Sequence, residues 1–195
     1  MNRKCVYLEN MYSFFANLSF KRLLLVAIVT ISAYTIQAQS DVMDLEQLGE
    51  LAPEKIEGYK KIGQNKGRSL KIGTLSYAMI ERTFVHDKKQ ITIMLFDYNN
   101  ASVMYRQATE KWKNALGQET DLILENAYEL EKQPGWILYD KAQKKSQITL
   151  GIQNRFYLVL IGQGILLTDL ESVAKIFDFV RFPPSSLNIM DPKFR

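Results

Sequence analysis

Cysteine and histidine are almost absent from this chain of 195 residues, which has one of each, Cys5 and His86. Cys5 precedes an apolar run that we predict to be removed with it, so the mature chain would hold no cysteine. Disulfides, thiol catalysis and cysteine-ligated metal sites are then excluded. Zinc sites usually draw on several cysteine and histidine ligands, so we expect neither a metal ion nor another cofactor.

Glycine and proline are also few, at 10 and 5 residues, and the hydrophobic and charged fractions of 47% and 24% are ordinary for a globular domain. The formal net charge of +4 is concentrated at the N-terminus, because four of the 25 basic but one of the 21 acidic residues lie within residues 1–38. The rest of the chain carries 21 basic and 20 acidic side chains, a net charge of +1. That balance removes the main electrostatic reason to expect a nucleic-acid partner.

The N-terminus has the pattern of a secretory signal. Lys21 and Arg22 precede an apolar run over residues 23–36, and small and polar residues follow around Ala38. A run of about 14 residues fits a signal peptide and is shorter than the roughly 20 residues of a membrane-spanning helix. We therefore predict a signal peptide over 1–38 and an exported protein, periplasmic or secreted, that is not transmembrane after cleavage. An uncleaved N-terminal anchor is the alternative.

Residues 39–52 are predicted to form a short amphipathic helix, because valine and leucine recur at helical spacing between acidic residues. The Gly- and Lys-rich stretch over 53–74 is interpreted as either a loop or an irregular edge strand. Two runs rich in β-branched and aromatic residues, 75–85 and 90–98, then predict a hairpin whose four-residue loop begins at His86.

The next part of the chain is predicted to form a helix, several strands and a second helix. Asn99 and Asn100 are expected to cap the first helix, which ends at Gly117. The second helix is expected to start at the capping-box sequence from Thr168 to Glu171. Three or four strands are predicted between the two helices, at about residues 122–131, 136–141, 146–152 and 155–161.

Together these elements predict an α+β fold with a single domain over residues 53–182 and a C-terminal tail over 183–195. We expect a mainly antiparallel sheet of about five to six strands with helices packed on it. The strand over 155–161 is apolar on both of its faces, which predicts a helix on each side of the sheet.

Several short phrases of the sequence carry a resemblance: Glu81-Arg82-Thr83-Phe84, Gly135-Trp136, Arg155-Phe156-Tyr157-Leu158-Val159 and Gly162-Gln163-Gly164. In these phrases the chain resembles a loose group of exported bacterial proteins without assigned function. Its layout is similar to the PsbP/Mog1-type α/β/α sandwich. The resemblance implies a fold and does not imply an activity.

No catalytic set is visible in the sequence. His86 falls in the predicted hairpin loop beside Asp87 and two lysines, which is typical of a solvated turn and not of a general base. Acidic residues could supply the paired carboxylates of a hydrolase, but the sequence selects no pair. The acidic residues considered are Asp97, Glu110, Asp121, Glu125, Glu129 and Glu131.

The basic stretch over residues 60–71 is the first candidate contact region. It holds five cations interleaved with glycines, among them Lys60, Lys61, Lys66 and Arg68. Such a segment is expected either to dock on an anionic surface or to be a solvated loop.

Two aromatic residues are the second candidate contact region. Trp136 follows a Pro-Gly pair at a predicted strand start, where a partly exposed ring could meet a ligand. Tyr139 lies three residues further along and could line the same apolar pocket.

Because no catalytic set is visible, we predict an exported non-enzymatic binding or assembly module of the bacterial cell envelope. Its partner would be an envelope protein or an anionic surface. The alternatives are a carrier of small apolar ligands or lipids and a carboxylate-dependent hydrolase. A carrier would need an apolar cavity between sheet and helix, and a hydrolase would need clustered carboxylates in a cleft.

Overall fold

The computed structural model describes residues 42–186, apart from the side chains of Lys113 and Asn114. All described residues belong to one compact unit. The predicted signal peptide over 1–38 lies outside the described residues, as does the predicted tail from residue 187 onward. Within residues 42–186, no helix is long and apolar enough to cross a membrane.

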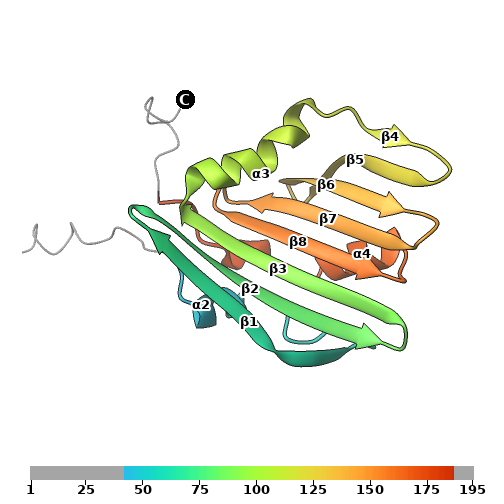
Figure 1. Cartoon of the computed structure of the whole chain (residues 1–195), viewed down its shortest axis with the longest axis horizontal. Coiled ribbons are helices and arrows are strands. Elements are labelled where there is room, and N and C mark those ends of the chain that lie inside the picture. The colour runs from blue at the N-terminus through green and yellow to red at the C-terminus, as the bar shows by residue number, and fades with distance from the viewer. Residues whose placement is uncertain (1–41, 187–195) are drawn as a thin grey trace, which may run out of the picture. The chain divides into compact units, whose positions relative to one another are not determined.

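The described part of the chain forms one eight-stranded sheet in which all neighbouring strands are antiparallel (Figure 1). In spatial order the strands are β1 (Lys60–Ile72), β2 (Leu75–His86), β3 (Lys89–Asn100), β8 (Phe156–Gln163), β7 (Lys145–Ile152), β6 (Gln133–Asp140), β5 (Ile123–Leu130) and β4 (Gln118–Glu119). The α+β prediction is confirmed, but the predicted count of five to six strands is wrong. The additional strands are the two edges, β1 and β4.

Helices cover both faces of the sheet. The helix α3 (Ser102–Asn114) lies on one face, and α2 (Leu45–Glu50) and α4 (Leu167–Ala174) lie on the other (Figure 1). We call these faces the α3 side and the α4 side. The two-faced pattern of β8 is the sequence origin of this arrangement, since Leu158 and Leu160 enter the large core on the α4 side while Tyr157 packs on the α3 side.

The two cores differ in size and chemistry. On the α4 side, aliphatic side chains from the sheet meet α2, α4 and three phenylalanines of the chain after α4, Phe177, Phe179 and Phe182. On the α3 side, Tyr105 of α3 and the N-cap residue Ala101 pack with aromatic residues of the sheet. The latter are Tyr77, Phe96, Tyr98 and Tyr157.

The predicted helix starts are wrong in detail. The N-cap of α3 is Ala101, without a side-chain capping bond, while the Asn100 amide donates to Ser76 Oγ on β2 (3.2 Å). The helix α4 begins at Leu167, before the predicted capping box, and its N-cap Leu166 also lacks a side-chain bond. The asparagine that fits a cap is therefore bound to a neighbouring strand, a competition that sequence spacing does not show.

The turns between β2 and β3 and between β7 and β8 are tight. Only Asp87 and Lys88 lie between β2 and β3, so the four-residue loop is wrong, and Asp87 has a left-handed φ of 52°. Between β7 and β8, Gln153 and Asn154 both have a left-handed φ of 53°. Consecutive residues with positive φ match the right-handed twist of hairpin strands.

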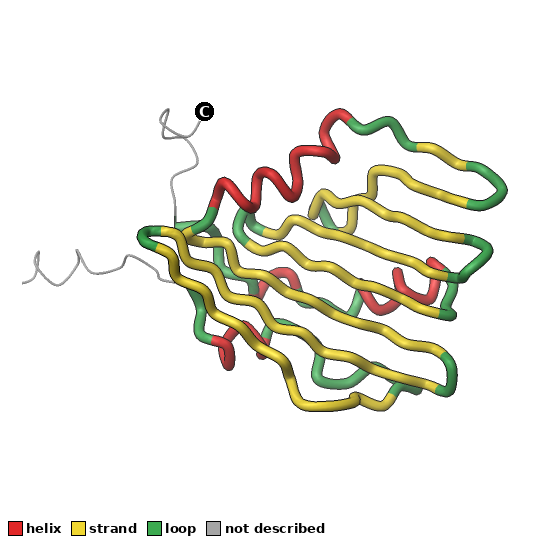
Figure 2. The backbone as a smooth tube through the Cα atoms, viewed as in Figure 1, coloured by secondary structure: helices red, strands yellow, loops and turns green. Residues whose placement is uncertain are grey.

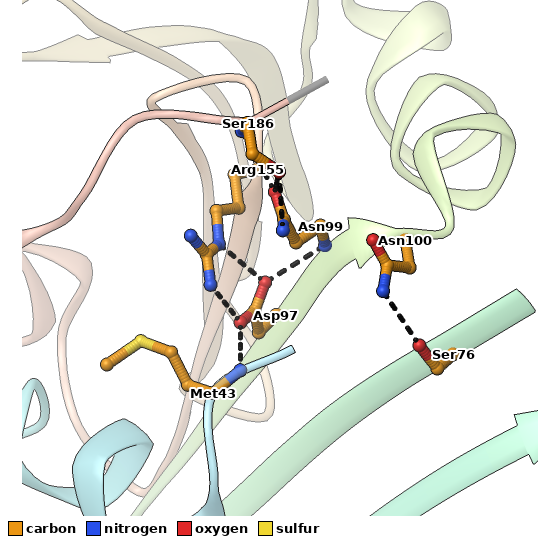
Figure 3. Close-up of polar contacts among 7 residues, drawn as sticks. All are labelled: Met43, Ser76, Asp97, Asn99, Asn100, Arg155 and Ser186. Atoms are coloured by element: carbon orange, nitrogen blue, oxygen red, sulfur yellow. Dashed lines mark hydrogen bonds and ion pairs between the residues drawn. The ribbon is translucent and has the colours of Figure 1, made fainter. Parts of the chain in front are cut away.

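A buried polar cluster ties both ends of the described chain to the sheet (Figure 3). Asp97 on β3 accepts two bonds from the Arg155 guanidinium, at 2.8 and 2.6 Å, and both side chains are at most 4% exposed. The same carboxylate accepts the backbone N–H of Met43 (2.8 Å), and Asn99 accepts the backbone N–H of Ser186 (3.1 Å). A buried bidentate pair with further hydrogen bonds compensates the desolvation of its charges, so we assign this cluster to structure.

Candidate functional site

The segment over 53–74, expected to be a loop or an irregular edge strand, contains the long edge strand β1. Figure 2 shows β1 running beside β2 along one border of the sheet. The pairing with β2 shifts between Ile62 and Lys66, and Gly63 in this bulge has a φ of 68°. From Lys66 to Ile72 the pairing is regular.

Alternation along β1 sorts its side chains onto the two faces. Residues that pair directly in an antiparallel sheet point to the same face, and Leu70 pairs with Tyr77, which packs on the α3 side. The side chains of β1 on the α3 side are therefore Lys60, Ile62, Lys66, Arg68, Leu70 and Ile72. We call these six residues the β1 surface.

The β1 surface is basic and solvent-exposed. Lys66 Nζ forms an ion pair with Glu81 Oε1 (2.8 Å), but 75% of its side chain stays exposed. Within residues 42–186, Lys60 and Arg68 form no ion pair, and both are exposed. This surface therefore keeps a net positive charge that solvent alone screens.

Apolar side chains are exposed on the same face as these cations. Ile62 and Leu70 are each 43% exposed and Ile72 is 65% exposed, and Leu75 across the β1–β2 turn is 48% exposed. Single exposed apolar residues need no explanation, but several of them on the same strand face as three cations are typical of an interaction site. These residues were not among the contacts predicted from the sequence, although Leu70 and Ile72 continue the period-two spacing of Lys66 and Arg68.

Lys61, the remaining cation of the predicted contact region, lies on the opposite face of β1. It pairs with Phe84 of β2, whose side chain lies in the α4-side core, and its Nζ contacts Glu54 Oε2 (2.6 Å). The hydrogen bond from Lys61 lowers the pKa of Glu54, and the nearby Arg82 charge acts in the same direction. Lys61 therefore holds the chain before β1 and is not part of the β1 surface.

Trp136 is buried, with 6% of the residue exposed, so the predicted partly exposed ring is wrong. It lies in the interior of β6, between β5 and β7, on the α3 side. Its indole Nε1 donates to Glu125 Oε1 (2.8 Å), which satisfies the polar edge of the ring inside the sheet.

Tyr139 faces the opposite way from Trp136. It is half-buried and packs against the α4-side core. Because three other strands (β3, β8 and β7) separate β6 from β2 and β1, neither aromatic residue joins the β1 surface. The predicted contact residues thus lie at separate places in the structure.

The aromatic cluster beneath α3 contains tyrosines whose pKa values are raised by burial. Burial raises the pKa of Tyr98 and of Tyr105 to about 12, and burial also raises the pKa of Tyr157. Trp112 of α3 stacks on Tyr157, and its indole Nε1 is buried without a hydrogen-bond partner. Gly151 allows this close approach, because a Cβ there would meet Tyr105 Oη at 2.5 Å. These groups pack α3 against the sheet.

Three of the residues weighed for catalysis, His86, Asp97 and Glu125, make structural contacts. The His86 ring packs at a tilt against the Tyr59 ring, and its Nδ1 contacts the carbonyl oxygen of Gly58. Asp97 is neutralised by Arg155, and Glu125 accepts from Trp136. Among the described residues, no group of three or more histidine, cysteine, aspartate or glutamate side chains is placed to hold a metal ion.

Comparison with known proteins gives no family. No protein-family model, no curated protein and no solved structure matches this chain. The function is therefore argued from the surface chemistry.

Proposed function

We propose that this protein is an exported, non-enzymatic binding module of the bacterial cell envelope that docks an anionic partner through the β1 surface. The observation that carries the proposal is the exposed edge strand on which Lys60, Lys66 and Arg68 share a face with exposed Ile62, Leu70 and Ile72. Cations attract an anionic partner over a distance, and adjacent apolar side chains add contact energy once it is bound.

One feature of the sequence and one of the structure support the rest of the proposal. The basic and apolar N-terminal segment supports export, and the layout of one antiparallel sheet with helices on both faces agrees with a PsbP/Mog1-like sandwich. Neither feature names the partner. On the α4 side of β1, Gly67 lies against Leu45 of α2, whereas the cations and exposed apolar residues of the β1 surface lie on the α3 side, so docking would use the α3 side and the free edge.

Photo-crosslinking in the native cells tests the docking. A photoreactive residue in place of Leu70 should give specific adducts, while the same residue in place of Lys175, exposed after α4 on the other face, should give none. Reversing two charges that form no ion pair, with Lys60→Glu and Arg68→Glu together, should remove the adducts at position 70. Equal labelling from both positions, or adducts that survive charge reversal, would overturn the proposal.

Intact mass tests the export. Protein recovered from the native cell envelope should have the mass of a chain that begins at Gln39 and should be found in the soluble fraction. A full-length chain in the membrane fraction would overturn cleavage and indicate an anchored module.

A further inference from the structure

We infer that the edge of β1 from Lys66 to Ile72 binds an extended acidic segment of a partner protein by adding it to the sheet as a ninth strand. The inference rests on the proposed function and specifies its partner. It follows from the free edge of β1, from the side chains that β1 presents, and from the charge of the strand.

The two edges of the sheet are built differently. The edge strand β4 has two residues, Gln118 and Glu119, and so offers little backbone for pairing. In contrast, β1 has 13 residues, all exposed apart from Lys61, and β2 is its one neighbour in the described sheet. An edge strand presents a row of unpaired N–H and C=O groups, and a short strand is one way to limit this. At the other border β4 pairs with only two residues of β5, which leaves the five residues 126–130 of β5 without a strand neighbour there, so β1 is the longer binding template.

The bulge protects only the first part of β1. The irregular pairing ends at Lys66, and seven residues from Lys66 to Ile72 then pair with β2 without interruption and without proline. Seven residues correspond to about 23 Å of extended strand. This length is sufficient for a peptide strand with alternating specificity contacts.

The side chains of this edge define a sequence pattern. On the α3 side, the order along β1 is Lys66, Arg68, Leu70 and Ile72, two cations followed by two apolar residues. A residue of an added strand lies about 5 Å from its cross-strand partner, so acidic residues suit the cations and apolar residues suit Leu70 and Ile72. Because every strand pair in this sheet is antiparallel, the partner should read apolar-x-apolar-x-acidic-x-acidic from its N-terminus.

The charge of β1 disfavours a second copy of this chain as the added strand. β1 carries Lys60, Lys61, Lys66, Arg68 and Lys71 and no acidic residue. Pairing two copies would gather cations from both strands along one seam. Lysine on an edge strand also hinders unspecific strand pairing, whereas an acidic strand turns the same charges into attraction.

Synthetic peptides test the inference on the full chain. The probe is the fluorescently labelled peptide Val-Thr-Ile-Thr-Glu-Thr-Glu, and its binding is measured by anisotropy at physiological salt. We expect it to bind at least about tenfold more tightly than the same residues in reversed order, because reversal places acids against Leu70 and Ile72. Equal affinity for both orders would overturn the inference.

Backbone methylation separates strand addition from simple charge attraction. In an added strand, alternate peptide N–H groups face β1 and the others face solvent. Two N-methylated peptides therefore test the pairing, one methylated at the Val, Ile and Glu positions and the other at the Thr positions. We expect one methylation pattern to abolish binding and the other to be tolerated. Equal effects of the two methylation patterns would also overturn the inference.

Charge exchange locates the site. Arg68→Glu should weaken binding about two- to fivefold or more, and changing the first Glu of the peptide to Lys should restore binding to this variant. The matched control Lys175→Glu should leave binding unchanged. Unfolding midpoints of both variants within about 2 °C of the unchanged protein would show that an exposed substitution has not disturbed the fold.

The outcomes separate this inference from the proposed function. Loss of all peptide binding, together with charge-dependent crosslinks from position 70 to lipid or polysaccharide, would overturn strand addition and leave the docking proposal in place. Absence of specific crosslinks from position 70 would overturn both.

Discussion

The two faces of the sheet solve burial in different ways, although they share the same strands. On the α4 side, a large set of strand residues is buried against α2, α4 and the phenylalanines that follow α4. On the α3 side, one helix covers the aromatic cluster and leaves the sheet beyond it partly exposed. The α4 side holds the fold together, and the α3 side is consequently available for contacts with other molecules.

The buried polar cluster on the α4 side provides the largest expected effect. Asp97→Ala removes the partner of the buried Arg155 guanidinium and releases the backbone N–H of Met43. Leaving one charge of a buried pair uncompensated costs about 3–5 kcal/mol, so urea unfolding should show a loss of that order. The exposed control Asp121→Ala should change the free energy of unfolding by less than about 0.5 kcal/mol. A loss below about 1 kcal/mol for Asp97→Ala would contradict the assigned role.

Adjacent residues of β8 compare the two faces directly. Leu160 is fully buried on the α4 side, whereas Ile161 points to the α3 side and is partly exposed. Leu160→Ala should cost about 2–5 kcal/mol through lost contacts and a cavity, and Ile161→Ala should cost about 1 kcal/mol. Denaturant unfolding of the two variants measures the difference. Equal losses would show that the α3 side is packed as tightly as the α4 side.

Alkaline pH gives a smaller effect, to which two tyrosines of the α3 side contribute. Burial raises the pKa of Tyr98 and Tyr105 to about 12 in the folded state, against about 10 in the unfolded chain. Between these values the unfolded state releases protons that the folded state keeps, so stability is intact below pH 10 and falls as the pH rises toward 12. Tyr105→Phe should flatten this decline in thermal unfolding curves measured between pH 9 and 12, relative to the unchanged protein. An unchanged slope would argue against the burial of this hydroxyl.

Much of the fold could be predicted from the sequence because local patterns and tertiary contacts agree. β-Branched and aromatic residues marked β2 and β3, alternation marked β7, and the two-faced apolar pattern of β8 predicted helices on both sides. The edge strands were harder to predict. β4 is too short to show a period, and the glycines and lysines of β1 fit a loop as well as an edge strand.

The candidate site was predicted only in part. The basic composition of 60–71 was visible, but the separation of Lys61 from the other cations depends on its pairing with Phe84 across the sheet. Trp136 was expected to be partly exposed because it follows Pro-Gly, yet its neighbours on β5 and β7 come from other parts of the chain and enclose it. Exposure depends on which strands become neighbours, and local spacing does not specify that.

The sequence by itself determined the α+β class and the positions of most strands, because composition and periodicity are local properties of the chain. Only the tertiary structure decided that β1 lies at a free edge and which of its side chains share a face. That decision depends on the strand order β1-β2-β3-β8-β7-β6-β5-β4, in which β3 pairs with β8 across more than 50 residues of intervening chain. Such long-range pairing arises from burying two core faces at once, and no single segment carries that information.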